Sequence, residues 1–186
     1  MTTVFIGGSR AVSRFNAIIC ERLDDLIRRN CTILVGDANG ADKAVQQHMA
    51  ARSYRNAIVY TMDECRNNLG NWSTNRVRSP GARKDFSYYA AKDLAMARDA
   101  DCGVMLWDGK SKGTLNNIQE LIGAGKKTLV YFAPEKTFYK LSSSRELEEL
   151  LQRCNPAAIQ EAQRQNQDQD SHRGPASPAR AAALTG

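Results

Sequence analysis

The chain has 186 residues, of which 42% are hydrophobic and 25% are charged, and this composition is typical of one globular domain. A core of about 150 residues is stable without a metal or a disulfide, and the five cysteines lack the spacing of a zinc site. We therefore expect no metal and no cofactor. No apolar run approaches the roughly 18 residues of a membrane span, and the first residues do not resemble a signal peptide. These features predict a cytoplasmic protein without a membrane partner.

The formal net charge is +6, and most of the excess lies in one internal stretch. Residues 66–98 contain seven Lys or Arg side chains and two Asp side chains. Residues 155–186, in contrast, contain no aromatic residue and few large apolar ones, so this segment cannot bury enough surface to fold. The sequence thus predicts one folded domain over residues 1–154 and a disordered C-terminal tail over residues 155–186.

Short apolar runs alternate with amphipathic segments along the folded part. In chain order, the pattern predicts a strand at 4–6, a helix at 15–29, a strand at 32–35, a helix at 41–51, strands at 57–60 and 103–107, a helix beginning near 114, a strand at 128–132 and a helix at 144–154. Brief, continuous apolar strands separated by helices are typical of a parallel sheet covered on both faces. The expected fold class is α/β, a Rossmann-like doubly wound parallel sheet of about five strands with helices on both faces.

Glycine-containing turns follow three of the predicted strands, at 7–10, 36–42 and 108–114. Parallel sheets of this kind bind ligands at the carboxyl ends of their strands, where these turns converge. Glycine lets the backbone approach a ligand closely, Arg10 can reach an anion, and the helix that begins near Thr114 offers free N–H groups to a phosphate. Taken singly, each turn is also explained as a structural turn, and Thr114 as a helix cap. Neither a Walker A loop nor a GxGxxG fingerprint is present.

Together these motifs resemble the SLOG superfamily. The resemblance rests on Gly7-Gly8-Ser9-Arg10, on Gly36 with Gly40-Ala41-Asp42, on the DAD sequence at 99–101 before an apolar strand, and on Gly113-Thr114 at a helix start. The superfamily includes the LOG phosphoribohydrolases and the DprA-type DNA-processing proteins. The resemblance implies a Rossmann-like domain that binds a nucleotide or an ADP-ribose-like ligand as a sensor or accessory module. It also implies a homodimer, for which the apolar side chains of Ile118, Leu121 and Ile122 are compatible with an interface and equally with the core.

The resemblance implies a set of ligand-binding residues. The phosphates would lie against Gly113-Thr114 and the first turn, the ribose near Asp37 or Asp42, and Arg83 and Lys84 would close over the ligand. The full set is Gly7, Gly8, Ser9, Arg10, Gly36, Asp37, Gly40, Ala41, Asp42, Arg83, Lys84, Asp108, Gly113, Thr114 and Asn117.

An alternative function is hydrolysis or transfer at the N-glycosidic bond of a nucleoside or nucleotide. LOG enzymes carry a glutamate at the position that Asn117 occupies, and an amide cannot act as a general base. The alternative therefore requires Asp42, Asp108 or Glu120 as the catalytic carboxylate. The chain is also similar, more loosely, to nucleoside 2-deoxyribosyltransferases in its acidic residues before and after the strand at 103–107.

The basic stretch has two interpretations. Arg76, Arg78, Arg83 and Lys84 could bind phosphates while Trp72, Tyr88 and Tyr89 stack on a base. In the other interpretation, residues 83–98 form a surface helix with Phe86, Tyr89 and Leu94 packed inward. An isoelectric point near 9.2 permits nucleic-acid binding, and DprA-like binding of single-stranded DNA is the third hypothesis for the function, although a nucleotide-type small molecule is the favoured partner.

Overall fold

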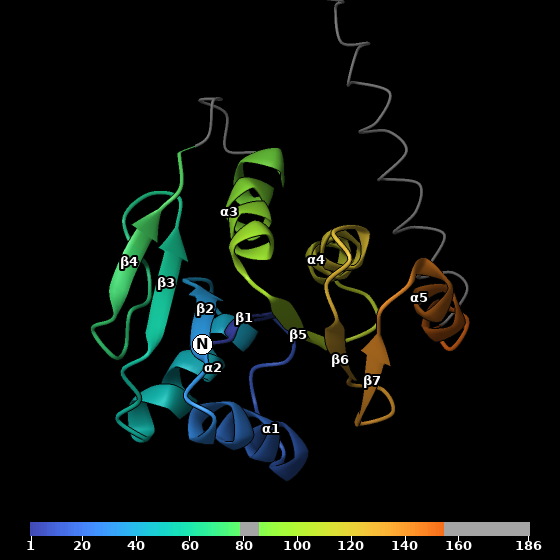
Figure 1. Cartoon of the computed structure of the whole chain (residues 1–186), viewed down its shortest axis with the longest axis horizontal. Helices are drawn as coiled ribbons and strands as arrows, with labels where there is room; N and C mark the ends of the chain where they lie inside the picture. The colour runs from blue at the N-terminus through green and yellow to red at the C-terminus, as the bar shows by residue number, and fades with distance from the viewer. Residues whose placement is uncertain (79–85, 155–186) are drawn as a thin grey trace, which may run out of the picture.

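The computed structural model describes residues 1–78 and 86–154, which form a sheet of seven strands between two layers of helices (Figure 1). The strands are β1 (Thr3–Gly8), β2 (Thr32–Gly36), β3 (Ala57–Thr61), β4 (Ser73–Arg76), β5 (Cys102–Trp107), β6 (Thr128–Phe132) and β7 (Thr137–Leu141). Their order is β4-β3-β2-β1-β5-β6-β7, and β7 alone among the described strands runs antiparallel to its neighbour. The predicted fold class is confirmed.

The helices are α1 (Ala17–Arg28), α2 (Ala41–Ala51), α3 (Phe86–Asp99), α4 (Lys112–Gly123) and α5 (Ser144–Leu151). α1 and α2 cover one face of the sheet, and α3, α4 and α5 cover the other (Figure 1). Each layer has its own apolar core, because a strand in a two-sided sheet points alternate side chains to opposite faces. On β1, Phe5 packs with α3 and α4, while Val4 and Ile6 pack with α1 and α2.

The predicted number of strands, about five, was too low, because both edge strands escaped the apolar pattern. β4 has the polar sequence STNR, and every one of its residues is exposed. β7 pairs with β6 as a short antiparallel return, and four of its five residues are not fully buried. An edge strand has one neighbour and needs no continuous apolar run, which is why the sequence pattern did not reveal these two.

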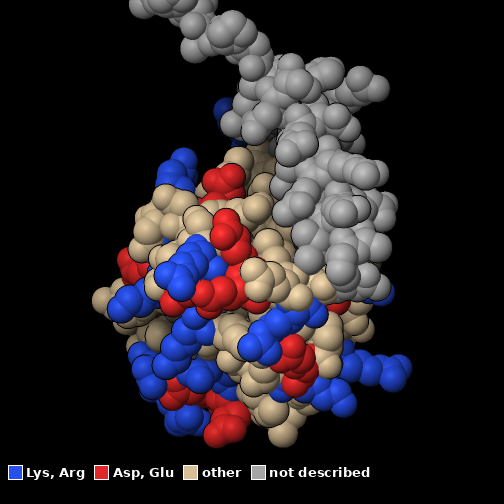
Figure 2. Space-filling model, turned by 90° about the vertical axis from the view of Figure 1, so that its right-hand side faces the viewer, with Lys and Arg blue, Asp and Glu red and all other residues tan. Residues whose placement is uncertain are grey.

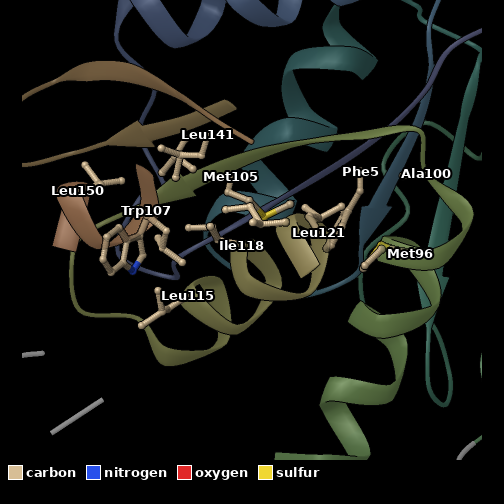
Figure 3. Packing of buried hydrophobic residues seen from close by; sticks show 14 of the residues in the cluster. Phe5, Met96, Ala100, Met105, Trp107, Leu115, Ile118, Leu121, Leu141 and Leu150 are labelled. Atoms are coloured by element: carbon tan, nitrogen blue, oxygen red, sulfur yellow. The ribbon is translucent and has the colours of Figure 1, made fainter. Parts of the chain in front are cut away.

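The apolar face of α4 belongs to the core of this chain. Ile118 and Leu121 are fully buried and Ile122 is nearly so, among side chains of α3, β5 and β6 (Figure 3). This packing contradicts the interpretation of these three residues as a dimer interface. No helix in the described part of the chain is long and apolar enough to cross a membrane.

The structure corrects one residue of the inward face in the second interpretation of the basic stretch. Leu94 is 39% exposed, whereas Tyr88, Lys92 and Met96 are buried at helical spacing on α3. The side chains of Phe86 and Tyr89 lie outside what the structure describes. Trp72 is buried in the core, where its indole N–H donates to the carbonyl of Tyr54 at 2.8 Å, so it is not available to stack on a base. Arg83, Lys84 and the predicted tail lie outside the described residues.

Candidate functional site

A cavity of about 370 Å³ opens where the strand order reverses, between the carboxyl ends of β1 and β5. This is the position at which doubly wound sheets bind ligands. Of the residues predicted from the sequence, the structure brings eight to its wall: Gly7, Gly8, Ser9, Arg10, Asp42, Gly113, Thr114 and Asn117. The turn after β1, the start of α2 and the first turn of α4 therefore share one cavity.

The turn after β1 is fastened to the end of β5. The backbone N–H of Ser9 donates to the carbonyl of Leu106 at 2.8 Å, and the Ser9 hydroxyl donates to Asp108 Oδ2 at 2.8 Å. A Cβ on Gly8 would lie 2.5 Å from that same Leu106 carbonyl oxygen, so only glycine fits here. These contacts hold the backbone of Gly8 and Ser9 in a fixed position at the mouth of the cavity.

Asp108 organises the loop that leads into α4. Its Oδ1 accepts backbone hydrogen bonds from Lys110 at 3.1 Å and from Ser111 at 2.7 Å, and its Oδ2 accepts the Ser9 hydroxyl. Because these contacts use both carboxylate oxygens, and Asp108 is not among the residues that line the cavity, its role is to shape the loop. Glu120 is exposed on α4 and also lies outside the cavity wall. Asp42 is thus the one predicted catalytic carboxylate that reaches the cavity.

The first turn of α4 forms part of the cavity wall. Ser111 caps the helix and its Oγ accepts from the Thr114 N–H at 3.4 Å. The N–H of Leu115 makes the first helical bond, to the carbonyl of Ser111, so the amides before it have no acceptor within the helix backbone. Gly113 and Thr114 line the cavity, so its wall includes the positive end of the helix dipole.

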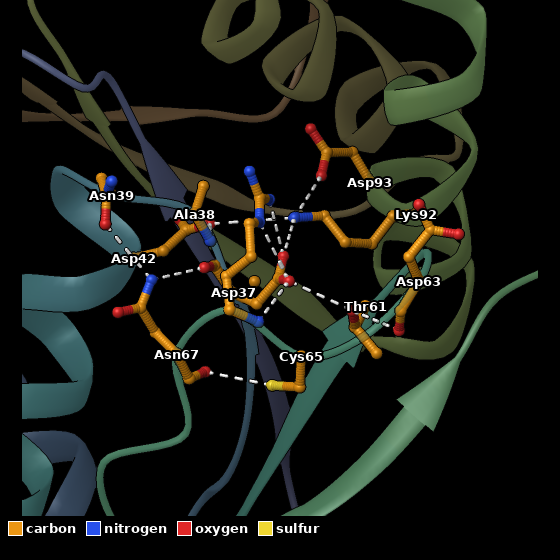
Figure 4. A network of polar contacts seen from close by, with 12 residues as sticks. Asp37, Ala38, Asn39, Asp42, Thr61, Asp63, Cys65, Asn67, Lys92 and Asp93 are labelled. Carbon is orange, nitrogen blue, oxygen red and sulfur yellow. Dashed lines mark hydrogen bonds and ion pairs between the residues drawn. The ribbon is translucent and has the colours of Figure 1, made fainter. Parts of the chain in front are cut away.

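A buried lysine lies among three carboxylates on the inner side of the cavity (Figure 4). Lys92 Nζ on α3 is 3.3 Å from Asp37 Oδ1, 4.0 Å from Asp42 Oδ2 and 4.0 Å from Asp93 Oδ1. Lys92 is 5% exposed. Burial alone would lower its pKa, but the three carboxylates raise that pKa, so the ammonium stays charged.

Asp37, predicted to bind a ribose, is engaged by protein groups. It is 1% exposed, and its carboxylate accepts from the Arg66 guanidinium, the Thr61 hydroxyl and Lys92. Burial by itself would raise the pKa of Asp37, but the hydrogen bonds and charges of Arg66 and Lys92 hold that pKa well below its usual range. Asp37 does not line the cavity, whereas Arg66 does, so the carboxylate supports the guanidinium from behind.

Asp42 and Asp93 face the cavity from α2 and α3. Burial raises the pKa of Asp42 to about 6, against the opposing charge of Lys92. Burial also raises the pKa of Asp93, whose Oδ2 accepts a hydrogen bond from the Asn117 amide at 3.1 Å. Asn117 is 6% exposed, so the position that the LOG resemblance singles out holds an amide that orients a carboxylate.

Gly36, Gly40 and Ala41 lie behind the wall of the cavity and shape it. A Cβ on Gly36 would come within 2.2 Å of Asp42 Oδ2 and 2.7 Å of Lys92 Nζ, so this glycine makes room for their ion pair. Gly40 has a φ of +88°, and a Cβ there would meet Arg10 Cα at 2.3 Å. Ala41 is fully buried and its N–H donates to the Ser9 carbonyl.

The sequence analysis did not assign Arg66, Lys92 or Asp93 to the site. These residues entered it as contributions to the charge of one stretch. A signal for Lys92 was present, since Tyr88, Lys92 and Met96 recur every four residues, which places the lysine on the buried face of a helix. Nothing comparable marks Arg66, whose partner Asp37 lies in a different loop.

No family model and no curated protein sequence matches the chain. Among solved structures, the fold is similar to DNA processing protein A from Helicobacter pylori, which was described for its mode of binding single-stranded DNA. The likeness covers 90% of this chain and 81% of that chain, with a TM-score of 0.54 and 14% sequence identity. It supports the Rossmann-like fold that the SLOG resemblance implies.

Proposed function

We propose that the cavity binds a nucleotide or a nucleotide-derived ligand, of the nucleoside phosphate or ADP-ribose type, and that the protein acts as a sensor or accessory domain. One observation carries the proposal: the glycine turn after β1 and the first turn of α4 lie in the wall of one cavity at the point where the strand order reverses. A phosphate between them would accept backbone hydrogen bonds from the helix and a charge-assisted bond from Arg10.

The size and composition of the cavity agree with such a ligand. Its volume of about 370 Å³ falls in the range of small-molecule sites. Arg10 and Arg66 line the cavity and supply positive charge for an anion. An anionic ligand of small-molecule size would therefore match the cavity.

Isothermal titration of the full chain with nucleoside mono- and diphosphates, NAD and ADP-ribose tests the proposal. We expect at least one of them to bind, and Arg10→Ala to weaken it about tenfold, the loss of one charge-assisted hydrogen bond. Arg55→Ala is the matched control, because Arg55 is exposed and lies outside the cavity wall. Absence of binding by the whole panel, or equal affinity in Arg10→Ala, would overturn the proposal.

The alternative of N-glycosidic cleavage keeps one supporting observation. Asp42 lines the cavity and its raised pKa of about 6 suits a proton donor near neutral pH. Chromatography of the same incubations for free base separates the two functions. Base release that is lost in Asp42→Asn would favour the enzyme, and binding without base release would favour the sensor.

Binding of single-stranded DNA is a second candidate, favoured by the fold likeness to DNA processing protein A. Arg76 and Arg78 are exposed at the β4 edge and line a second cavity of about 400 Å³. At the opposite edge of the sheet, where β7 and α5 lie, basic and acidic side chains are interspersed (Figure 2). Some of them form pairs, such as Arg145 with Glu149. The β4 edge is therefore the better candidate surface.

Fluorescence anisotropy with a labelled oligo-dT tests this second candidate. We expect affinity to fall steeply with salt and to drop in an Arg76→Ala/Arg78→Ala double variant, because phosphate contacts release counterions. Arg28→Ala/Arg29→Ala, at the C-terminal end of α1, is the matched control. Equal loss in both double variants would indicate attraction by net charge and would contradict a specific surface at β4.

A further inference from the structure

The inner wall of the cavity alternates hydrogen-bond acceptors with a donor. Lys92 Nζ lies 4.0 Å from a carboxylate oxygen of Asp42 on one side and 4.0 Å from one of Asp93 on the other (Figure 4). All three side chains line the same cavity. The wall therefore presents an acceptor, a donor and a second acceptor in a row.

The two carboxylates have acceptor capacity that the protein leaves unused. Asp42 is 8% exposed, and within the described part of the chain it accepts one hydrogen bond, from the Ala38 N–H at 3.4 Å. Asp93, whose side chain is 26% exposed, accepts one from Asn117. A carboxylate has room for about four hydrogen bonds, and a buried one that lacks donors, such as Asp42, is costly. A ligand that brings donors to this wall would remove that cost.

The charges of the wall select the kind of donor. Lys92 would repel a cationic ligand, and Asp42 and Asp93 would repel an anionic one. A neutral group that both donates and accepts fits the row: each of two adjacent hydroxyls can donate to one carboxylate and accept from the ammonium. The vicinal diol of a ribose is such a group.

We propose that Asp42, Lys92 and Asp93 bind the 2′- and 3′-hydroxyls of a ribose, so that the cavity selects ribonucleotides over deoxyribonucleotides. The inference rests on the proposed nucleotide site and names its ligand class. The resemblance implied a ribose near Asp37 or Asp42; the proposal keeps Asp42 and replaces Asp37 by Asp93, since Asp37 is occupied by Arg66 and Lys92. Asn117 acts as a positioning residue through its hydrogen bond to Asp93.

The experiment compares matched ribo- and 2′-deoxyribonucleoside 5′-monophosphates, with each of the common bases, by isothermal titration of the full chain. We expect the wild type to bind the ribose form about tenfold more tightly, because the 2′-deoxy form lacks one hydrogen bond to a charged group. One of the two variants Asp42→Asn and Asp93→Asn should bring this ratio close to one, and the other should do the same for the 3′-deoxy form. Asp25→Asn, on the outer helix α1, should keep the wild-type ratio.

A change in the ligand supplies a test that does not depend on the folding of any variant. The 3′-deoxyribonucleotide should bind the wild type about tenfold more weakly than the ribonucleotide, because it loses the partner of the second carboxylate. Asn117→Ala should lower the ribose preference, because it removes the hydrogen bond that positions Asp93, and a general loss of stability would not change that ratio.

Three outcomes overturn the inference. Equal affinity of the wild type for ribo-, 2′-deoxy- and 3′-deoxynucleotides would remove the sugar site and leave the proposed nucleotide site standing. A ribose preference that persists in both Asp42→Asn and Asp93→Asn would assign the selection to other residues. Failure of all these nucleotides to bind, with the oligo-dT anisotropy positive, would remove the nucleotide site itself and favour the DNA-binding surface.

Discussion

Arg66 holds Asp37 through one edge of its guanidinium, with Nη2 2.9 Å from Oδ1 and Nε 3.2 Å from Oδ2. The Arg66 backbone N–H adds a third bond to Oδ2 at 3.2 Å. The pair ties the loop after β3 to the end of β2 and leaves the guanidinium at the cavity wall. A guanidinium fixed in this way loses little further freedom when it meets an anion.

Arg66→Ala should lower the free energy of unfolding by about 2 kcal/mol. Removing one partner of a buried pair costs about 3 to 5 kcal/mol, but Lys92 still faces Asp37, and the Arg66 side chain is 48% exposed. Urea denaturation measures the change. Arg98→Ala is the control, because the Arg98 pair with Asp99 is on the surface and should contribute less than the Arg66 pair. Equal effects of the two substitutions would contradict the assigned role of the buried pair.

Asp42 should make the protein more stable as the pH falls from 7 toward 4. Its pKa is about 6 in the folded chain and 3.8 ordinarily, so the folded state binds the proton more tightly between these values. Its contribution to stability is present at low pH and is lost as the pH rises through 6. The charged groups that face it are Lys92, Asp93 and Asp37, and the lysine alone among them opposes the shift.

The measurement is the free energy of unfolding of the wild type and of Asp42→Asn. It is determined by urea titration at several pH values between about 4.5 and 7.5. The difference between the two proteins should change by on the order of 2 kcal/mol across this window. A pH-independent difference would show that Asp42 is ionised in the folded protein throughout. Asp25→Asn, whose carboxylate lies on α1, provides the comparison for the general effect of removing one acid.

Gly36→Ala should be strongly destabilising, because its methyl group would overlap Asp42 Oδ2 and Lys92 Nζ at 2.2 and 2.7 Å. Both atoms belong to buried side chains, so neither can move without exposing or separating a charged pair. We expect a loss of about 3 kcal/mol or more, as for other overpacked interior sites. Gly123→Ala is the matched control, since nothing lies within 4 Å of a Cβ there. A melting temperature of Gly36→Ala equal to that of the control would contradict the packing.

Local sequence predicted much of this fold and part of the site. The helix expected at 41–51 is α2, residue for residue, because its apolar spacing is regular and a glycine precedes it. β4 was missed because four exposed polar residues carry no apolar signal. The glycine turns could be assigned to the site because each follows a predicted strand. In a parallel sheet, the carboxyl ends of the strands lie at one edge, so turns that follow them converge there.

Pairs that form across the fold could not be inferred in the same way. The hydrogen bond between Asn117 and Asp93 joins residues of two helices that are 24 positions apart in sequence. Arg66 and Asp37 are 29 positions apart. Each depends on the packing of α3 or of the loop after β3, which no local pattern fixes. For this reason Asp37 was expected to bind the ligand. In our proposal, its partners Arg66 and Lys92 face the ligand instead.

Gly113→Ala separates binding at the cavity from stability. Nothing lies within 4 Å of a Cβ at this position, and alanine favours a helix over glycine by up to about 1 kcal/mol, so the variant should be as stable as the wild type or slightly more stable. Its methyl group would nevertheless stand at the wall where we place the phosphate. We expect nucleotide affinity to fall about tenfold with an unchanged or higher melting temperature.

Gly123→Ala, at the other end of α4, is the comparison that makes this prediction sharp. It carries the same substitution in the same helix, also in open space, but away from the cavity. It should therefore raise helix stability without any change in nucleotide affinity. If Gly113→Ala bound nucleotides as tightly as Gly123→Ala, the phosphate would have to lie elsewhere, because a methyl group that fills its position cannot leave its hydrogen bonds to the helix N–H groups intact.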